Sequence, residues 1–154
     1  TGHFDPLIQA CEALSKKEEF LAQIGMGYIE PSFPFFRTGP PEKLEGHMQE
    51  AELVITHGGT GMLSTLYRLK KRAVIIPKQI RYGEANDSQV ELAVKWGELK
   101  MGTLCKDVVN LEQAIQECRS TDPVFPVFPS LGQALKASLV SGSSVTAQTL
   151  RTYR

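Results

Sequence analysis

The stretch that most constrains the fold is residues 53–66, where an apolar run, a cluster of glycines and a helical pattern follow one another. Val54 and Ile55 are β-branched residues typical of a buried strand. Three glycines then fall within positions 58–61, which indicates a tight turn. The apolar residues after the turn recur at helical spacing: Met62, Leu63 and Leu66. The stretch therefore predicts a strand, a glycine turn and the start of a helix.

Such a turn suits a negatively charged ligand. Glycines let the backbone approach a ligand and adopt positive φ without a side-chain clash. The first amides of the following helix, together with its dipole, attract anions, and a diphosphate is the anion we expect. The spacing matches neither a dinucleotide fingerprint nor a phosphate-binding loop, because no lysine follows Gly61. A tight turn without a ligand therefore stays an alternative.

Length, charge and cysteine content exclude several classes of protein. The 154 residues suffice for one domain with a sizeable core. Lys+Arg and Asp+Glu are both 17, and this zero net charge argues against a nucleic-acid partner. No apolar run approaches the roughly 20 residues that span a bilayer. Cys11, Cys105 and Cys118 are widely spaced and form no metal-ligand pattern, so we read them as reduced structural thiols and expect no metal.

Strand and helix patterns alternate along the chain. We expect helices at about 6–17, 42–51, 61–69, 88–96, 110–118 and 131–140, and strands at about 19–24, 35–37, 53–56, 73–76 and 103–105. We expect Asp5 to cap the first helix, a capping box of Asn110 with Gln113, and Gly97 to end the helix that begins near Ser88. The alternation predicts an α/β, Rossmann-like fold with a mostly parallel sheet and helices on both faces.

The sequence also supports predictions about the bounds of the domain and about its basic run. We treat residues 1–154 as a single domain, with 120–154 as a peripheral C-terminal extension. A domain rarely begins on a loop that leads straight into a helix, so we expect a strand just upstream of Thr1. The basic run at 70–72 is expected to be a solvated helix end.

Three loops follow the carboxyl ends of expected strands, where ligands bind in parallel sheets: 1–5, 57–61 and 77–88. The third holds side chains that can hydrogen-bond the hydroxyls of a sugar: Arg81, Glu84, Asn86, Asp87 and, just beyond it, Gln89. The alternative is a solvated loop in which Asp87 caps the next helix.

Three segments that follow one another along the chain resemble a known family: AELVITHGGTG (51–61), RAVIIP (72–77) and YGEANDSQVELA (82–93). Together they resemble the C-terminal domain of family 28 glycosyltransferases, the donor-binding half of the two-domain GT-B fold. The likeness extends more loosely to residues 1–8 and is greatest to short single-domain members. These include the catalytic subunit of the dolichol-linked UDP-N-acetylglucosamine transferase and bacterial exopolysaccharide glycosyltransferase subunits.

The resemblance implies which residues contact a UDP-sugar substrate. In the family, the glycine turn that matches Gly58, Gly59, Thr60 and Gly61 faces the donor diphosphate. The polar loop that matches Asn86, Asp87 and Gln89, with Glu84 beside them, contacts the donor sugar. Such inverting enzymes let an acceptor hydroxyl attack the anomeric carbon while the nucleoside diphosphate leaves. The resemblance implies no cofactor beyond the UDP-sugar itself and no metal.

The chain departs from the family pattern at two positions. Many members carry a glutamate that grips the ribose where this chain has Thr65, and a histidine where it has Ser88. These changes leave open whether the donor preference differs or the site has lost its activity.

Two histidines are candidate catalytic residues. His57 ends the strand at the expected site, where it can contact phosphate or transfer a proton, or else orient the turn through a backbone hydrogen bond. His3 lies near the acceptor if the first loop covers the site.

The resemblance also implies a partner. A GT-B enzyme has two domains, so we expect a separate, membrane-tethered, acceptor-binding subunit and a cytoplasmic protein that meets the membrane through it. Several aromatic residues can form the docking patch or pack in the core: Phe33, Phe35, Phe36, Phe125 and Phe128. The expected function is transfer of N-acetylglucosamine or a hexose from a UDP-sugar to a lipid-linked or polysaccharide acceptor. The alternatives are a non-catalytic nucleotide-sugar-binding module and an interaction domain that has lost its ligand.

Overall fold

A computed structural model describes residues 3–78 and 87–127 of the chain. In chain order the elements are α1 (Asp5–Leu14), β1 (Ala22–Gln23), β2 (Phe35–Phe36), α2 (Pro41–Glu50), β3 (Val54–Thr56), α3 (Thr60–Leu69), β4 (Ala73–Ile75), α4 (Asp87–Glu98), β5 (Thr103–Leu104), the 3-10 turn η2 (Val108–Asn110) and α5 (Leu111–Ser120). The helix expected at 131–140 lies outside the described residues.

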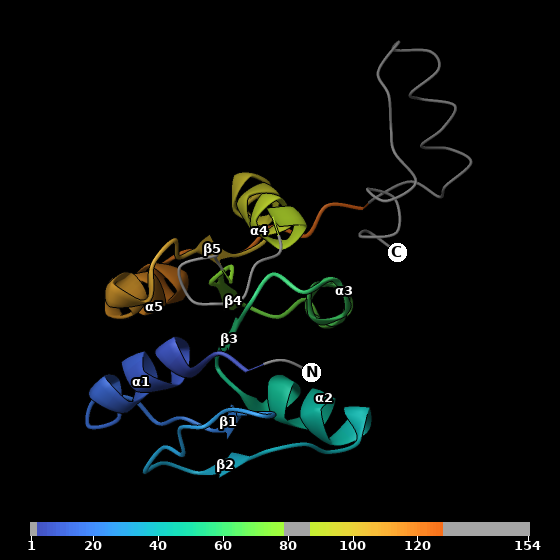
Figure 1. The fold of residues 1–154 in the computed structure, drawn as a ribbon. Coiled ribbons are helices and arrows are strands. Elements are labelled where there is room, and N and C mark those ends of the chain that lie inside the picture. Colours follow the sequence, from blue (N-terminus) through green and yellow to red (C-terminus); the bar gives the residue numbers. More distant parts are fainter. Residues whose placement is uncertain (1–2, 79–86, 128–154) are drawn as a thin grey trace, which may run out of the picture.

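Every strand pairing in the described residues is parallel. β1 pairs with β2, with Ala22 opposite Phe35. β3, β4 and β5 form a second sheet with β4 at its centre. Figure 1 shows the strands in one row between two layers of helices, with α1 and α5 together on one side. The parallel α/β prediction is thereby confirmed.

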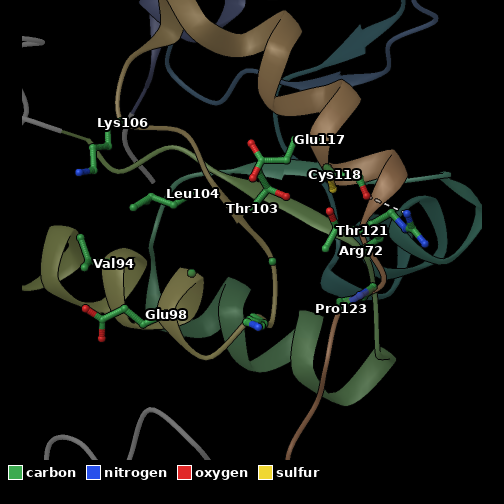
Figure 2. Close-up of a pocket in the computed structure, with 13 residues that line it drawn as sticks. Arg72, Val94, Glu98, Thr103, Leu104, Lys106, Glu117, Cys118, Thr121 and Pro123 are labelled. Atoms are coloured by element: carbon green, nitrogen blue, oxygen red, sulfur yellow. Dashed lines mark hydrogen bonds between the residues drawn. The ribbon is translucent and has the colours of Figure 1, made fainter.

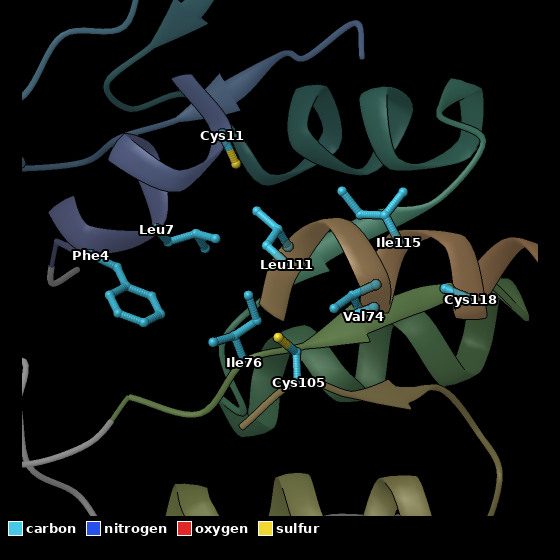
Figure 3. Close-up of a cluster of buried hydrophobic side chains, with 10 residues drawn as sticks. Phe4, Leu7, Cys11, Val74, Ile76, Cys105, Leu111, Ile115 and Cys118 are labelled. Carbon is cyan, nitrogen blue, oxygen red and sulfur yellow. The ribbon is translucent and has the colours of Figure 1, made fainter. Parts of the chain in front are cut away.

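β4 explains why helices cover both faces of the sheet. Its side chains alternate between the two faces, and all of them are buried. Val74 and Ile76 pack with α1 and α5, and Figure 3 shows side chains of these two helices gathered over this face. Ala73 and Ile75 pack with α2, α3 and α4 on the other face, where the largest fully buried side chain is Trp96. The continuous apolar run of the sequence thus becomes the middle of a three-layer fold.

The three predicted thiols agree with the structure. Cys11, Cys105 and Cys118 are free and buried. Burial raises the pKa of the Cys11 thiol to about 12, and burial also raises the pKa of the Cys105 and Cys118 thiols. In the part of the chain that the structure describes, no helix has the length and apolar character needed to cross a membrane.

Three local predictions at helix ends are wrong. Asp5 is the first residue of α1, not its cap, and its Oδ2 accepts a hydrogen bond from the Tyr28 N–H at 3.2 Å. Asn110 makes no side-chain cap, because η2 precedes α5 and Asp107 caps that turn through the Val109 N–H. Gly97 lies inside α4, which continues to Glu98. For Asp5 and Asn110, a tertiary or neighbouring contact outweighs the local signal.

The basic run at 70–72 is only partly a solvated helix end. Lys70 ends α3 in the left-handed conformation, with its ammonium 4.0 Å from the centre of the Tyr67 ring. The Arg72 guanidinium instead contacts the end of α5 and donates hydrogen bonds to the carbonyls of Cys118 and Arg119 at 2.7 and 2.6 Å. Arg72 therefore caps the C-terminus of α5.

Among the described residues, three of the candidate docking aromatics are half-buried and contact other rings of the domain. Phe33 lies against Phe20, with ring centres 5.3 Å apart, and Phe125 lies against Tyr67 at 6.2 Å. Phe36 contacts the ring of His47, which bridges β2 and α2. Phe35 is 36% exposed. Phe128 lies outside the described residues.

Candidate functional site

The glycine turn lies where the sequence places it, between the carboxyl end of β3 and the N-terminus of α3. Thr56 ends β3, and its carbonyl accepts the Ile76 N–H at 2.8 Å. Gly59 is the N-cap of α3, with extended backbone angles. The turn therefore opens at the carboxyl edge of the parallel sheet, which is where ligands bind in such folds.

The three glycines of the turn have different neighbours. A Cβ at Gly58 would lie 2.6 Å from the carbonyl oxygen of Gln89 and 3.2 Å from the Cβ of Ala93, so this glycine lets α4 pack against the turn. A Cβ at Gly59 would lie 2.4 Å from the Cε1 of His57. A Cβ at Gly61 would meet no described atom within 4 Å. Gly61 alone of the three faces open space among the described residues.

His57 holds the turn through its own ring. Its Nδ1 accepts a hydrogen bond from the Gly59 N–H at 2.9 Å. A ring nitrogen that accepts a hydrogen bond carries no proton, so the neutral ring has its proton on Nε2. This geometry supports the orienting role among those considered for His57, and it leaves Nδ1 engaged with the backbone.

The first turn of α3 presents backbone amides at the sheet edge. Leu63 donates the first hydrogen bond of the helix, to the Gly59 carbonyl at 3.0 Å, so the amides of Thr60, Gly61 and Met62 precede it. Within the described residues no side chain caps this end of α3. Thr60 and Gly61 are both exposed. An open helix N-terminus with these features favours an anion.

Thr65 lies one turn further along α3. Its hydroxyl donates to the carbonyl oxygen of Gly61 at 3.1 Å. The hydroxyl proton is therefore used within the helix, and only the oxygen lone pairs are left for a ligand. A glutamate, which the resemblance implies at this position, could accept hydrogen bonds from two ribose hydroxyls through its two carboxylate oxygens.

α4 brings part of the polar loop to the glycine turn. Gln89, in the first turn of α4, has a half-buried side chain, and its carbonyl lies beside Gly58. Asp87 begins α4. Arg81, Glu84 and Asn86 lie outside the described residues.

Residues 3–5 reach the same sheet edge from the start of the chain. The Lys78 ammonium, just after β4, donates to the His3 carbonyl at 2.9 Å and lies 5.9 Å from the centre of the Phe4 ring. The His3 ring meets Tyr28 edge-on, with ring centres 5.4 Å apart. The structure therefore brings the first loop close to the loop that follows β4, as the sequence analysis expected.

Lys78 is a residue that the sequence analysis did not select. It places a half-buried positive charge near an edge where an anion is expected. The available signal was its position directly after Pro77, at the carboxyl end of a predicted central strand.

A cavity of about 560 Å³ lies elsewhere, beside β5 between α4 and α5. Figure 2 shows Thr103 and Leu104 between Glu98 on α4 and Glu117 on α5. Its lining includes no residue of the glycine turn and not Gln89. No predicted site residue therefore contributes to it. In the described residues no cluster of three or more His, Cys, Asp or Glu side chains is arranged to hold a metal.

A parallel sheet with helices on both faces and a glycine turn leading into a helix defines the class of Rossmann-like α/β domains. Comparison with known families is more specific: the profile of the glycosyltransferase family 28 C-terminal domain matches residues 8–127. The chain therefore belongs to this family and is a nucleotide-sugar-binding glycosyltransferase domain. No curated protein and no solved structure gives a significant match.

Proposed function

We propose that this chain is the donor-binding catalytic subunit of an inverting glycosyltransferase. It transfers N-acetylglucosamine or a hexose from a UDP-sugar to a lipid-linked or polysaccharide acceptor. The observation that carries the proposal is the uncapped first turn of α3, which opens beside the glycine turn at the carboxyl edge of the sheet. Family membership supplies the class of donor.

The reaction is a single displacement at the anomeric carbon. The oxygen of an acceptor hydroxyl forms a bond to that carbon while the bond from the carbon to the β-phosphate oxygen breaks. The electron pair stays on the departing UDP, and the hydroxyl proton passes to a base. Amides fixed at the α3 N-terminus stabilise the negative charge that grows on the phosphate, at no cost of rearrangement.

The two histidines take different parts in this proposal. His57 positions the turn, because its Nδ1 accepts the Gly59 N–H. His3 is the candidate for the proton of the acceptor hydroxyl, since its backbone is held at the same sheet edge by Lys78. Gln89 is the described residue of the polar loop that we assign to the donor sugar.

The acceptor half of the enzyme is proposed to be a separate, membrane-tethered subunit. The family profile describes a C-terminal domain, and the GT-B fold that the sequence resembles closes its active site between two such domains. We therefore place the chain in the cytoplasm, at a membrane through this partner.

A second candidate function is a nucleotide-sugar-binding module without turnover. The hydrogen bond from the Thr65 hydroxyl to the Gly61 carbonyl favours it, because the side chain at this position cannot grip a ribose as a glutamate can. Both candidates bind a UDP-sugar, and only the first transfers the sugar.

A titration followed by NMR, combined with a transfer assay, separates the possibilities. Isotope-labelled chain is titrated with UDP, UDP-N-acetylglucosamine, UDP-glucose and GDP-mannose, and then assayed for transfer with a membrane fraction of its source as acceptor. Saturable, uridine-selective shifts at Gly58, Gly61 and Gln89 with transfer support the enzyme. The same shifts without transfer support the binding module. Shifts confined to other residues contradict both.

A further inference from the structure

The loop that follows β1, residues 25–30, is held by a side chain from the end of β2. The Arg37 guanidinium donates to the carbonyls of Gly25 and Gly27 at 3.3 and 2.9 Å. It also donates to the Glu30 carboxylate at 2.6 Å. The Gly25 N–H returns a hydrogen bond to the Arg37 carbonyl at 3.0 Å, and Gly25 has a φ of 54°, which glycine adopts without strain. Arg37 therefore defines the path of this loop.

Helix α1 holds the same loop from another side. The Asp5 carboxylate accepts the Tyr28 N–H at 3.2 Å through Oδ2. A Cβ at Gly27 would lie 2.7 Å from Oδ1 of the same carboxylate, so the close approach of the loop to α1 requires a glycine there. Because contacts from two elements fix its backbone, a ligand that binds this loop loses little free energy to ordering it.

The fixed loop presents two large apolar side chains to solvent. Met26 is 69% exposed and Tyr28 is 85% exposed. The Tyr28 ring meets the His3 ring edge-on, with ring centres 5.4 Å apart. Tyrosine and methionine are enriched where proteins bind their partners and ligands. An exposed pair on a fixed backbone therefore indicates a binding surface beside His3.

This surface lies at the sheet edge where we place the reaction. The Lys78 ammonium, just after β4, donates to the His3 carbonyl at 2.9 Å, and the neighbouring strand β3 leads into the glycine turn. His3 is the residue that we assign to the proton of the acceptor hydroxyl. A base lies within about 2.6–3.2 Å of the group that it deprotonates. The part of the acceptor that carries this hydroxyl therefore lies next to the Tyr28 ring.

We propose that Tyr28 is a stacking platform for the acceptor, and that the reacting hydroxyl belongs to a sugar ring. The face of an aromatic ring is apolar and carries partial negative charge, which suits the C–H face of a pyranose. Stacking of these two faces leaves the sugar hydroxyls at the rim, where one can reach His3. A phosphate, or the hydroxyl of a glycerol unit, offers no such face. This inference rests on the proposed function, because His3 marks where the acceptor reacts.

A titration followed by NMR tests the platform. Isotope-labelled chain is titrated with methyl β-N-acetylglucosaminide and, in parallel, with glycerol, which has hydroxyls but no ring. The sugar should shift the Tyr28 amide and the His3 ring signals saturably at millimolar concentration, and glycerol should not. Tyr28→Ala should weaken sugar binding about 10-fold, whereas Tyr28→Phe keeps the ring and should bind within about 2-fold of the unaltered chain. Val109→Ala, at an 80% exposed apolar position on η2, is the control and should change nothing.

The affinity for UDP, measured by calorimetry on the same variants, separates this inference from the proposed function. Tyr28→Ala should change the affinity for UDP less than about 2-fold, because the ring contacts the acceptor and not the donor. Several results overturn the platform whether or not UDP binds: no saturable shift at Tyr28, equal shifts with glycerol, or a Tyr28→Ala chain that binds the sugar as the unaltered chain does. An equal loss of UDP and sugar affinity assigns the ring to the nucleotide and also overturns it. Sugar binding at Tyr28 in a chain that binds no UDP-sugar supports the platform and contradicts the proposed donor site.

Discussion

At the scale of single residues, the glycine turn is held by contacts made on different sides of it. Gly58 leaves room for α4, Gly59 leaves room for the His57 ring, and Gly61 leaves the N-terminus of α3 open. The His57 ring closes the turn on itself by accepting the Gly59 N–H. We therefore assign His57 a structural task within the proposed binding site.

Replacement of His57 by asparagine separates this task from proton transfer. An asparagine side chain can accept a hydrogen bond from the amide two residues on, as His57 Nδ1 does. His57→Ala should weaken UDP-sugar binding about 5-fold, by loss of a hydrogen bond worth about 1 kcal/mol. His57→Asn should recover most of that loss, as measured by calorimetry. If His57→Asn binds as poorly as His57→Ala, the ring contributes more than orientation.

Gln89 is predicted to act on the sugar and not on the nucleotide. Gln89→Ala should reduce the affinity for UDP-N-acetylglucosamine about 10-fold and change that for UDP less than 2-fold, because one hydrogen bond to the sugar is lost. The matched control is Glu91→Ala, an exposed position two residues further along α4. Equal losses for both ligands would place Gln89 away from the sugar.

At the scale of elements, the C-terminus of α5 is held by a residue remote in sequence. Arg72, beside β4, donates to two carbonyls at the end of α5 and to Asp122 at 2.9 Å. The Arg72 side chain is 25% exposed, whereas the Asp122 side chain is 98% exposed. The carbonyl contacts are therefore the important ones, since an exposed ion pair contributes little.

Two substitutions test that ranking. Arg72→Met should lower the free energy of unfolding by about 1–3 kcal/mol, because it leaves helix carbonyls without their donor. Asp122→Asn should change it by less than about 0.5 kcal/mol. Urea unfolding curves measure both values. A larger loss for Asp122→Asn than for Arg72→Met would contradict the capping role.

The elements were more predictable from the sequence than their contacts. The apolar run at 73–76 and the helical spacing after Gly61 give β4 and α3, because burial on both faces and the 3.6-residue period leave a direct pattern. The sequence predicts helix caps at Asp5 and Asn110, and both predictions are wrong. A sequence pattern cannot show that Tyr28 bonds the Asp5 carboxylate or that η2 precedes α5. In the site, the turn was predictable, but the separate neighbours of its three glycines and the contact of Lys78 with His3 depend on distant segments.

At the scale of the whole molecule, Arg119 joins three parts of the chain. Its guanidinium donates to Glu18, which follows α1, at 2.7 and 2.5 Å, and to Glu52, which precedes β3, at 2.9 Å. These hydrogen bonds lower the pKa of the Glu18 carboxyl below its ordinary value of 4.5. The folded state therefore binds the Glu18 proton more weakly than the unfolded state does.

This linkage predicts sensitivity to acid. The stabilisation from Glu18 is present above pH 4.5 and is lost as the pH falls through the lowered folded-state pKa. Glu18→Gln should cost about 1 kcal/mol near pH 7 and progressively less as the pH falls below 4.5, as measured by urea unfolding. Glu112→Gln, in the more exposed pair with Lys17, is the control and should cost less than half as much. A cost for Glu18→Gln that does not change with pH would contradict the linkage.

We propose that the open N-terminus of α3 holds the diphosphate of a UDP-sugar. A calorimetric titration of Gly61→Asp with UDP-N-acetylglucosamine tests it most directly. The added carboxylate suits the helix dipole, and loss of a glycine favours the helix, so stability should rise by about 0.5–1 kcal/mol. The same carboxylate repels a diphosphate, so we expect the affinity to fall at least about 30-fold. Gly46→Asp in α2, where a side chain also meets nothing within 4 Å, adds the same charge and should bind as the unaltered chain does. If Gly61→Asp binds the UDP-sugar as tightly as Gly46→Asp, the diphosphate does not lie at α3 and the account is wrong.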